Sequence, residues 1–329
     1  MLRFVLKRLA LTVPLALGVL TLTFALLESA PGNPSDLLIG ARPIPQEVRE
    51  RIERAYGFDR PPAERYLRWL AALTFHGELG WSHSRGKTVA AAIGEALPPT
   101  IALAGTALAL HVVIGVLLGI VSAAKRGRWP DRVLTLASLT LYAMPTFWLA
   151  LMAVLALSYW IPIFPTSSLR SVGAENWSLG WQLLDRLWHL ALPAFVLGLA
   201  SAAAMTRFVR AGLIQALGQE FARAARARGV GGRRMLLVHA LRNSMIPVVN
   251  LVGLSLPVLF SGSLVTEVIF AWPGMGRLTY DAILADDISV VLVTTLLATL
   301  MVVVGNLAAD LAMVAVDPRI RLEARRSGS

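Results

Sequence analysis

Long apolar runs dominate the pattern of hydrophobic and polar positions along this chain, and six of them could form membrane-spanning helices. A helix needs roughly 20 apolar residues to cross about 30 Å of hydrocarbon. No run alternates as a half-buried strand would, and an open sheet could not satisfy its backbone polar groups in lipid. The pattern therefore predicts an all-α polytopic membrane helical bundle, a single membrane domain over residues 1–329, with six transmembrane helices at 9–28, 100–124, 133–160, 188–205, 246–270 and 288–316.

Composition agrees with a membrane protein. The 329 residues are 56% hydrophobic and 16% charged, and the mean hydropathy is +0.64, which is too apolar for an ordinary soluble domain. Arg3, Lys7 and Arg8 precede the first run as in a signal peptide, but this run is longer than the roughly 7 to 15 apolar residues of a cleavable signal. We expect the first helix to be retained.

The basic residues predict the orientation. Short loops and termini on one side of the six spans hold 19 Lys and Arg residues, and the short loops on the other side hold 3. Because short cytoplasmic loops are enriched in Lys and Arg, both termini should be cytoplasmic and residues 30–99 should form an outer, periplasmic segment. Basic residues spread in this way also account for the net charge of +11, so no nucleic-acid partner is expected. The expected partner of the apolar surface is membrane lipid.

Enzyme and cofactor chemistry finds little support in the residues. The chain has no cysteine, which excludes disulfides, thiolate metal sites and cysteine nucleophiles, and His76, His83 and His239 are too scattered for a metal site. The stretch 80–88 ends in Gly-Lys-Thr like a phosphate-binding loop, but five residues instead of four separate Gly80 from Gly86. We expect no cofactor in this chain.

The outer segment should contain two helices. Pro45 and Gly57 can begin and end a short solvated helix. After Pro61 and Pro62 follows an amphipathic stretch whose apolar positions are Tyr66, Leu67, Trp69, Leu70 and Leu73. Such a stretch could cap the bundle or offer a docking surface to a partner.

The cytoplasmic segment 207–245 is too long for a simple connection between bundle helices. Residues 221–227 predict a helix rich in alanine, Gly229 to Gly232 a break, and the residues after Arg233 a second helix. Small side chains would let another protein approach the backbone closely. A basic amphipathic hairpin lying on the anionic inner leaflet is the alternative.

Five stretches resemble, in the same order, the permeases of binding-protein-dependent ABC importers in the dipeptide, oligopeptide and nickel branch. The most specific is FARAARARGVGGRRMLLVHALRNSMIPVV at 221–249, which is similar to their cytoplasmic coupling loop. The others are KRLALTVPLALGVLTLTFALLESAPGNP at 7–34, DRPPAERYLRWL at 59–70, EVIFAWPGMGRL at 267–278 and VDPRIR at 316–321. The stretches are distributed from one end of the chain to the other, so the resemblance covers essentially the whole chain.

The resemblance implies a type I importer permease fold in a bacterial inner membrane. It implies three kinds of partner subunit: a second, homologous permease that completes a heterodimer, two ATPase subunits that hold the ATP and Mg, and a periplasmic or lipid-anchored substrate-binding protein. In the coupling loop, Ala224, Ala225 and Gly229 match the family pattern, Val230 follows, and Arg223 replaces an acidic residue. These residues would contact an ATPase, and the chain itself would not be an enzyme.

The cargo implied by the resemblance is a short peptide, with nickel chelates, glutathione or another small solute as alternatives. The segment that closes the fifth span is a candidate outer gate, because an interfacial Trp would anchor it and its Pro and Gly residues would bend the backbone away from a helix. A plain interfacial turn is the alternative. Its residues are Glu267, Phe270, Trp272, Pro273, Gly274 and Gly276.

Two other classes of protein, a secondary transporter and an intramembrane serine protease, would need polar residues within the spans. His111, Asn306 and Asp310 are too few for the proton relay of a secondary transporter. An intramembrane serine protease would need a serine and a base, for which Ser263 and His111 are nominal candidates that nothing connects.

Overall fold

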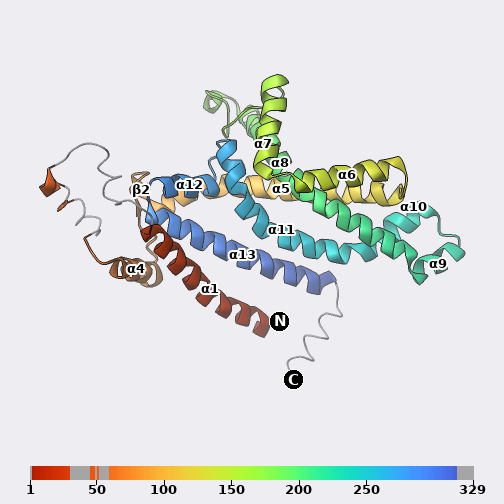
Figure 1. Ribbon diagram of the computed structural model, residues 1–329, viewed down its shortest axis with the longest axis horizontal. Helices are drawn as coiled ribbons and strands as arrows, with labels where there is room; N and C mark the ends of the chain where they lie inside the picture. Colours follow the sequence, from red (N-terminus) through yellow and green to blue (C-terminus); the bar gives the residue numbers. More distant parts are fainter. Residues whose placement is uncertain (1, 30–44, 49, 52–58, 317–329) are drawn as a thin grey trace. The chain divides into compact units, whose positions relative to one another are not determined.

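The computed structural model describes residues 2–29, 45–48, 50–51 and 59–316 (Figure 1). The chain divides into two compact units, which are described separately: unit 1 comprises Met1–Thr100 and Pro273–Met301, and unit 2 comprises Ile101–Trp272 and Val302–Ser329. Two long helices, α5 (Val89–Ala124) and α13 (Ile288–Val316), contribute to both.

Unit 1 is built from helices around a small hairpin. Its other elements are α1 (Leu2–Glu28), α4 (Pro62–Ala71), the π turn η1 (Ala72–His76), the strands β1 (Trp81–Ser82) and β2 (Lys87–Thr88), and α12 (Met275–Leu284). The strands are antiparallel, with Trp81 opposite Thr88. The core joins the start of α5 to α12 and α13 through Val89, Ile93, Leu278 and Val290.

The amphipathic stretch of the outer segment packs on the first helix. Pro62 occupies the first turn of α4, where its missing N–H leaves no hydrogen bond unmade. The Tyr66 ring lies 5.1 Å from the Phe24 ring between centroids, and the Tyr66 hydroxyl is 2.9 Å from Thr21 Oγ1. Leu67, on the opposite side, is exposed. One side of α4 therefore packs on α1 through Tyr66, while Leu67 stays exposed, and the choice between a cap and a docking surface stays a prediction.

Unit 2 is organised around α8, the longest helix of the described residues. Its elements besides α5 and α13 are α6 (Trp129–Ala143), α7 (Thr146–Val154), the π turn η2 (Leu155–Trp160), η3 (Ala174–Asn176), α8 (Leu179–Gly218), α9 (Glu220–Ala227), α10 (Gly232–Arg234), the π turn η4 (Met235–Ala240) and α11 (Leu241–Ile269). Helices α6, α7 and α11 all contact α8.

Helices α5 and α8 pack closely because glycine lies at their contacts. A Cβ added at Gly115 would lie 2.5 Å from the Met205 side chain, and a Cβ at Gly119 would lie 2.6 Å from the Val209 side chain. A Cβ at Gly198 would lie 2.8 Å from the Ala107 carbonyl oxygen. Gly115 and Gly119 are four residues apart, the spacing that lets helix backbones approach in membranes. The spacing of these two glycines can be read in the sequence, but the contact between α5 and α8 was not predicted from it.

The helical class is confirmed, with the two short strands as its only sheet in the described residues. Four helices there are long and apolar enough to cross a membrane, namely Ala10–Glu28, Val89–Ala124, Leu179–Gly218 and Ile288–Leu311. The predicted span 133–160 corresponds to two helical segments, Trp129–Ala143 and Thr146–Trp160, bent by 105°. Met144, held extended before Pro145, explains the bend.

The described residues cover the remaining predicted helices only in part. The span at 246–270 falls within α11, but many of its side chains lie outside the described residues, so the count of six stays a prediction. Most of the predicted helix between Pro45 and Gly57 also lies outside them. Helix α8 runs unbroken from Leu179 to Gly218, well past both ends of the predicted span 188–205 and into the segment predicted as a loop from 207.

Candidate functional site

Helix α9, which follows α8 along the chain within unit 2, carries the predicted coupling residues (Figure 1). Gln219 is extended and separates α8 from α9. Glu220 in the first turn of α9 and Arg226 in the last complement the helix dipole. Ala222 and Ala225 are buried against Met235 of η4, with Phe221 and Val230 packed around them. The inner face of α9 is thus fixed to the hairpin that returns the chain to α11.

Gly229 ends α9 in a left-handed conformation. The Val230 N–H donates to the Ala225 carbonyl at 3.1 Å, and the Gly229 N–H donates to the Arg226 carbonyl at 2.9 Å. These two bonds define a Schellman motif, and Val230 supplies its usual hydrophobic contact at Ala225. Gly229 has φ +82° and open space where a Cβ would lie, so its requirement for glycine is conformational.

The predicted ATPase-contacting residues lie on two different sides of α9. Arg223 and Ala224 are exposed, as is Ala227 one turn further on, whereas Ala225 is only 6% exposed and points into the hairpin. Three residues after Ala222, Ala225 falls on the same side of a helix with 3.6 residues per turn. Ala225 therefore supports the helix from inside, Arg223 and Ala224 are accessible, and contact of these residues with an ATPase stays a prediction.

A buried carboxylate holds the C-terminal half of α8 to its neighbours. Asp131, at the start of α6 and 3% exposed, accepts hydrogen bonds from Arg210 Nε at 2.6 Å and Arg210 Nη2 at 2.9 Å. It also accepts bonds from the Ser122 hydroxyl on α5 and the Gly127 N–H at 2.8 Å. Such bidentate pairs fix geometry as well as charge. Asp131, the only acidic residue of a strongly basic loop, was the sequence signal for this contact.

The end of α11 has the same hydrogen-bond pattern as the end of α9. The Trp272 N–H donates to the Glu267 carbonyl at 2.8 Å, and the Ala271 N–H donates to the Val268 carbonyl at 3.2 Å. Here the left-handed position, with φ +47°, is occupied by Ala271, which carries a Cβ. An alanine in this region is strained by roughly 1 to 2 kcal/mol relative to a right-handed conformation.

Two buried aromatic residues flank Ala271 and enter different clusters. Phe270, 1% exposed, packs with Ala150 of α7 and Leu192 and Val196 of α8. Trp272, also 1% exposed, packs on the other side among residues of α5 and α8, including Leu103, Ala107, Ala194 and Leu197. The Ser168 N–H donates to the Phe270 carbonyl at 2.9 Å. This packing holds the chain in its left-handed turn.

The predicted gate segment is corrected at two residues. Trp272 is buried among helices and is not exposed at a membrane interface. Gly276 lies inside α12 and does not bend the chain; the bend is made by Ala271, exposed Pro273 and extended Gly274, which precedes α12. Glu267 is fully buried. The segment crosses between the units, since Trp272 belongs to unit 2 and Pro273 to unit 1.

The polar candidates for other chemistries are not brought together by the described residues. His111 is 3% exposed, and neither ring nitrogen has a hydrogen-bond partner among them. The Ser263 side chain lies outside those described. The described part of the chain contains no group of three or more His, Asp or Glu residues that could hold a metal ion. The π turns η1 and η4 carry His76 and His239, respectively.

The long apolar helices define a multi-pass membrane protein, and comparison with known proteins identifies its family. Residues 115–322 match the model of the binding-protein-dependent transport system inner membrane component, and residues 1–104 match the model of the N-terminal part of that membrane component. The chain belongs to this family. The expected ABC importer permease and its type I fold are thereby confirmed, as is its role as a transport subunit that works with ATPase and substrate-binding partners.

Relatives match over nearly their whole length. The oligopeptide transport system permease protein AppB of Bacillus subtilis (strain 168) is 36% identical over 318 residues, 96% of this chain and 98% of the relative. The dipeptide transport system permease protein DppB of Escherichia coli (strain K12) is 34% identical over 337 residues, 98% and 99%. A putative peptide transport system permease protein of Brucella abortus (strain 2308), BAB2_1050, is 37% identical over 319 residues, 97% and 99%.

Proposed function

We propose that this chain forms half of the membrane pathway of an ATP-driven importer of short peptides. A second, homologous permease subunit completes the heterodimer, and two ATPase subunits on the cytoplasmic side bind ATP and Mg. A periplasmic or lipid-anchored binding protein delivers the cargo from outside, and both termini of the chain are cytoplasmic. The names of relatives that match almost from end to end support the peptide cargo. The split of basic residues supports the orientation.

The outer face of α9 couples the pathway to an ATPase. The observation that carries this proposal is the two-sided character of α9. Small Ala222 and Ala225 fasten one side, while exposed Ala224 and Ala227 leave a low surface on the other, beside Arg223. A partner groove can approach such a surface closely. A displacement of α9 would reach α8 and η4 directly, because α9 contacts both. The Asp131–Arg210 pair would then pass it to α5 and α6.

A charge added to this surface tests the proposal. Ala224→Arg should weaken ATPase assembly and reduce both peptide transport and binding-protein-stimulated ATP hydrolysis at least about tenfold, since an unpaired charge buried on docking costs several kcal/mol. The matched control is Ala211→Arg, the same substitution at an exposed alanine of α8. The measurement is transport and stimulated hydrolysis by the reconstituted complex.

The alternative, a basic hairpin held on the inner leaflet, predicts another outcome. There an added arginine strengthens attraction to anionic lipid by about 1 kcal/mol at either position. Wild-type transport by the Ala224→Arg complex would therefore contradict coupling through this face. Transport by the purified chain without any partner would instead indicate a secondary transporter.

A further inference from the structure

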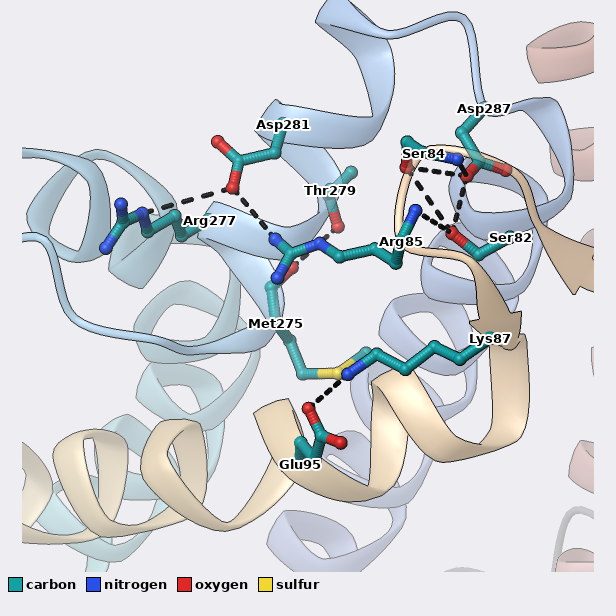
Figure 2. A network of polar contacts seen from close by, with 10 residues as sticks. All are labelled: Ser82, Ser84, Arg85, Lys87, Glu95, Met275, Arg277, Thr279, Asp281 and Asp287. Atoms are coloured by element: carbon teal, nitrogen blue, oxygen red, sulfur yellow. Dashed lines mark hydrogen bonds and ion pairs between the residues drawn. The ribbon is translucent and has the colours of Figure 1, made fainter.

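Unit 1 contains a charged cavity of about 220 Å³ beside the β1–β2 hairpin (Figure 2). Its walls come from the hairpin, the start of α5 and the segment from Pro273 through α12. These segments lie in the two regions predicted to be on the outer side of the membrane. Three basic and two acidic side chains line it, a net charge of +1: Arg85, Lys87, Arg277, Glu95 and Asp281.

The charges in the cavity are distributed unevenly. Arg85 Nη2 donates to Asp281 Oδ2 at 2.9 Å, and Arg277 Nε lies 4.0 Å from the same oxygen. One carboxylate thus stands between two guanidinium groups, as Figure 2 shows. Lys87 pairs separately with Glu95. Guanidinium groups match carboxylates in shape as well as charge, so this wall of the cavity is suited to one further carboxylate.

The cavity is rigidly supported from behind. Asp287 is fully buried and accepts hydrogen bonds from Ser82 Oγ at 2.6 Å and from Ser84 Oγ at 2.7 Å. The Arg85 N–H in turn donates to Ser82 Oγ at 3.2 Å. The loop that carries Arg85 is thereby tied to the turn between α12 and α13. A site held in this way loses little conformational entropy when a partner binds.

The size and exposure of the cavity limit its occupant. Pockets for small-molecule ligands usually measure about 300 to 1,000 Å³, and this cavity is smaller. The Arg85 and Arg277 side chains are each 39% exposed, so the site opens to solvent. It has room for one projecting side chain.

We propose that this cavity is a docking site for the substrate-binding protein, and that it receives an aspartate or glutamate side chain of that protein. The inference rests on the proposed import function, because only an importer has such a partner on its outer side. The added carboxylate would bind Arg85 and Arg277 beside Asp281 and neutralise the excess charge. Since the site is partly exposed, the attraction should weaken as salt increases.

Two variants should change docking in opposite directions. Arg277→Glu makes the lining net negative and should weaken binding of the cargo-loaded binding protein about five- to tenfold. Asp281→Asn removes the competing carboxylate and should strengthen binding about threefold, with a steeper salt dependence. A damaged fold cannot explain tighter binding. The matched control is Arg68→Glu, on exposed α4 of the same unit, which should bind as wild type.

The measurement is the Kd of the loaded binding protein for the whole complex in vesicles, at low and high salt, together with unstimulated ATP hydrolysis. The cargo peptide is supplied with a free and with an amidated C-terminus, and both should give the same shifts. Unchanged Kd values in both variants, or shifts in the same direction, would overturn the inference alone. Shifts confined to the free-acid peptide would also overturn it, because the cavity would then bind cargo. No stimulation of wild-type hydrolysis by the binding protein would overturn the proposed function as well.

Discussion

The ends of α9 and α11 close with the same pair of hydrogen bonds but differ in residue and surroundings. At α9 the left-handed position is Gly229, exposed and with open space around it. At α11 it is Ala271, between the buried aromatic residues Phe270 and Trp272. Glycine makes the first turn without strain, whereas packing imposes the second on a residue that resists it. A backbone turn can thus be set by local conformational freedom or by the tertiary environment.

This difference has a consequence for function. The turn at Gly229 belongs to the proposed ATPase contact, where an exposed segment must keep its shape with little packing to hold it. The turn at Ala271 lies in the predicted gate segment, next to the point at which the chain passes from unit 2 to unit 1. Strain stored at such a position can be part of a conformational change.

The largest effect on stability is expected from a substitution that disrupts the packing at the end of α11. Trp272→Ala removes a fully buried indole and should lower the free energy of unfolding by about 3 to 5 kcal/mol. Trp177→Ala is the control, because Trp177 is 43% exposed, and it should lose far less. Denaturant unfolding of the purified subunit in detergent measures both. Equal losses would contradict the assignment of Trp272 to the core of unit 2.

A smaller effect is expected when the glycine turn is blocked. Gly229→Val places a β-branched residue at φ +82° and should cost about 1 to 3 kcal/mol of local stability. The complex should still assemble, but peptide transport and stimulated hydrolysis should fall severalfold. Gly231→Val is the control, since Gly231 has φ −63° and open space at its Cβ position. If both variants transport equally, the conformation of Gly229 has no special role.

The smallest effect has the opposite sign. Ala271→Gly relieves the left-handed strain and should raise the free energy of unfolding by about 0.5 to 1 kcal/mol, which a thermal melt detects. Ala285→Gly is the control at a helix end with φ −100°, where glycine should give no gain. A lower Tm for Ala271→Gly than for its control would show that the strain at Ala271 is not significant.

The sequence predicted the features that depend on long stretches of the chain. Apolar runs and basic loops indicated the helical membrane class, and the alanine-rich stretch with Gly229 indicated a helix and its end. The side of α9 that faces the hairpin could not be assigned from the sequence, because positions 222, 224 and 225 are all alanine. Only the packing of Ala222 and Ala225 against Met235 distinguishes them from Ala224.

Contacts between distant segments were also missed. The Asp131–Arg210 pair joins residues 79 positions apart, and the Asp287 bond to Ser82 spans 205 positions. Trp272 was expected to be an interfacial anchor but is buried in a cluster, and its residue type could not distinguish the two, because tryptophan fits both environments. In each case the residue type was compatible with the structure, but the partner was set by the tertiary fold.

The most direct test of the coupling claim is cysteine labelling on α9, since the chain has no native cysteine. A membrane-impermeant maleimide should label Ala224→Cys in inside-out vesicles that contain the permease alone, and assembly with the ATPase should protect it. Ala225→Cys, whose position is buried, should react slowly in both states. Labelling of Ala224→Cys from the periplasmic side, or equal labelling with and without the ATPase, would contradict the account.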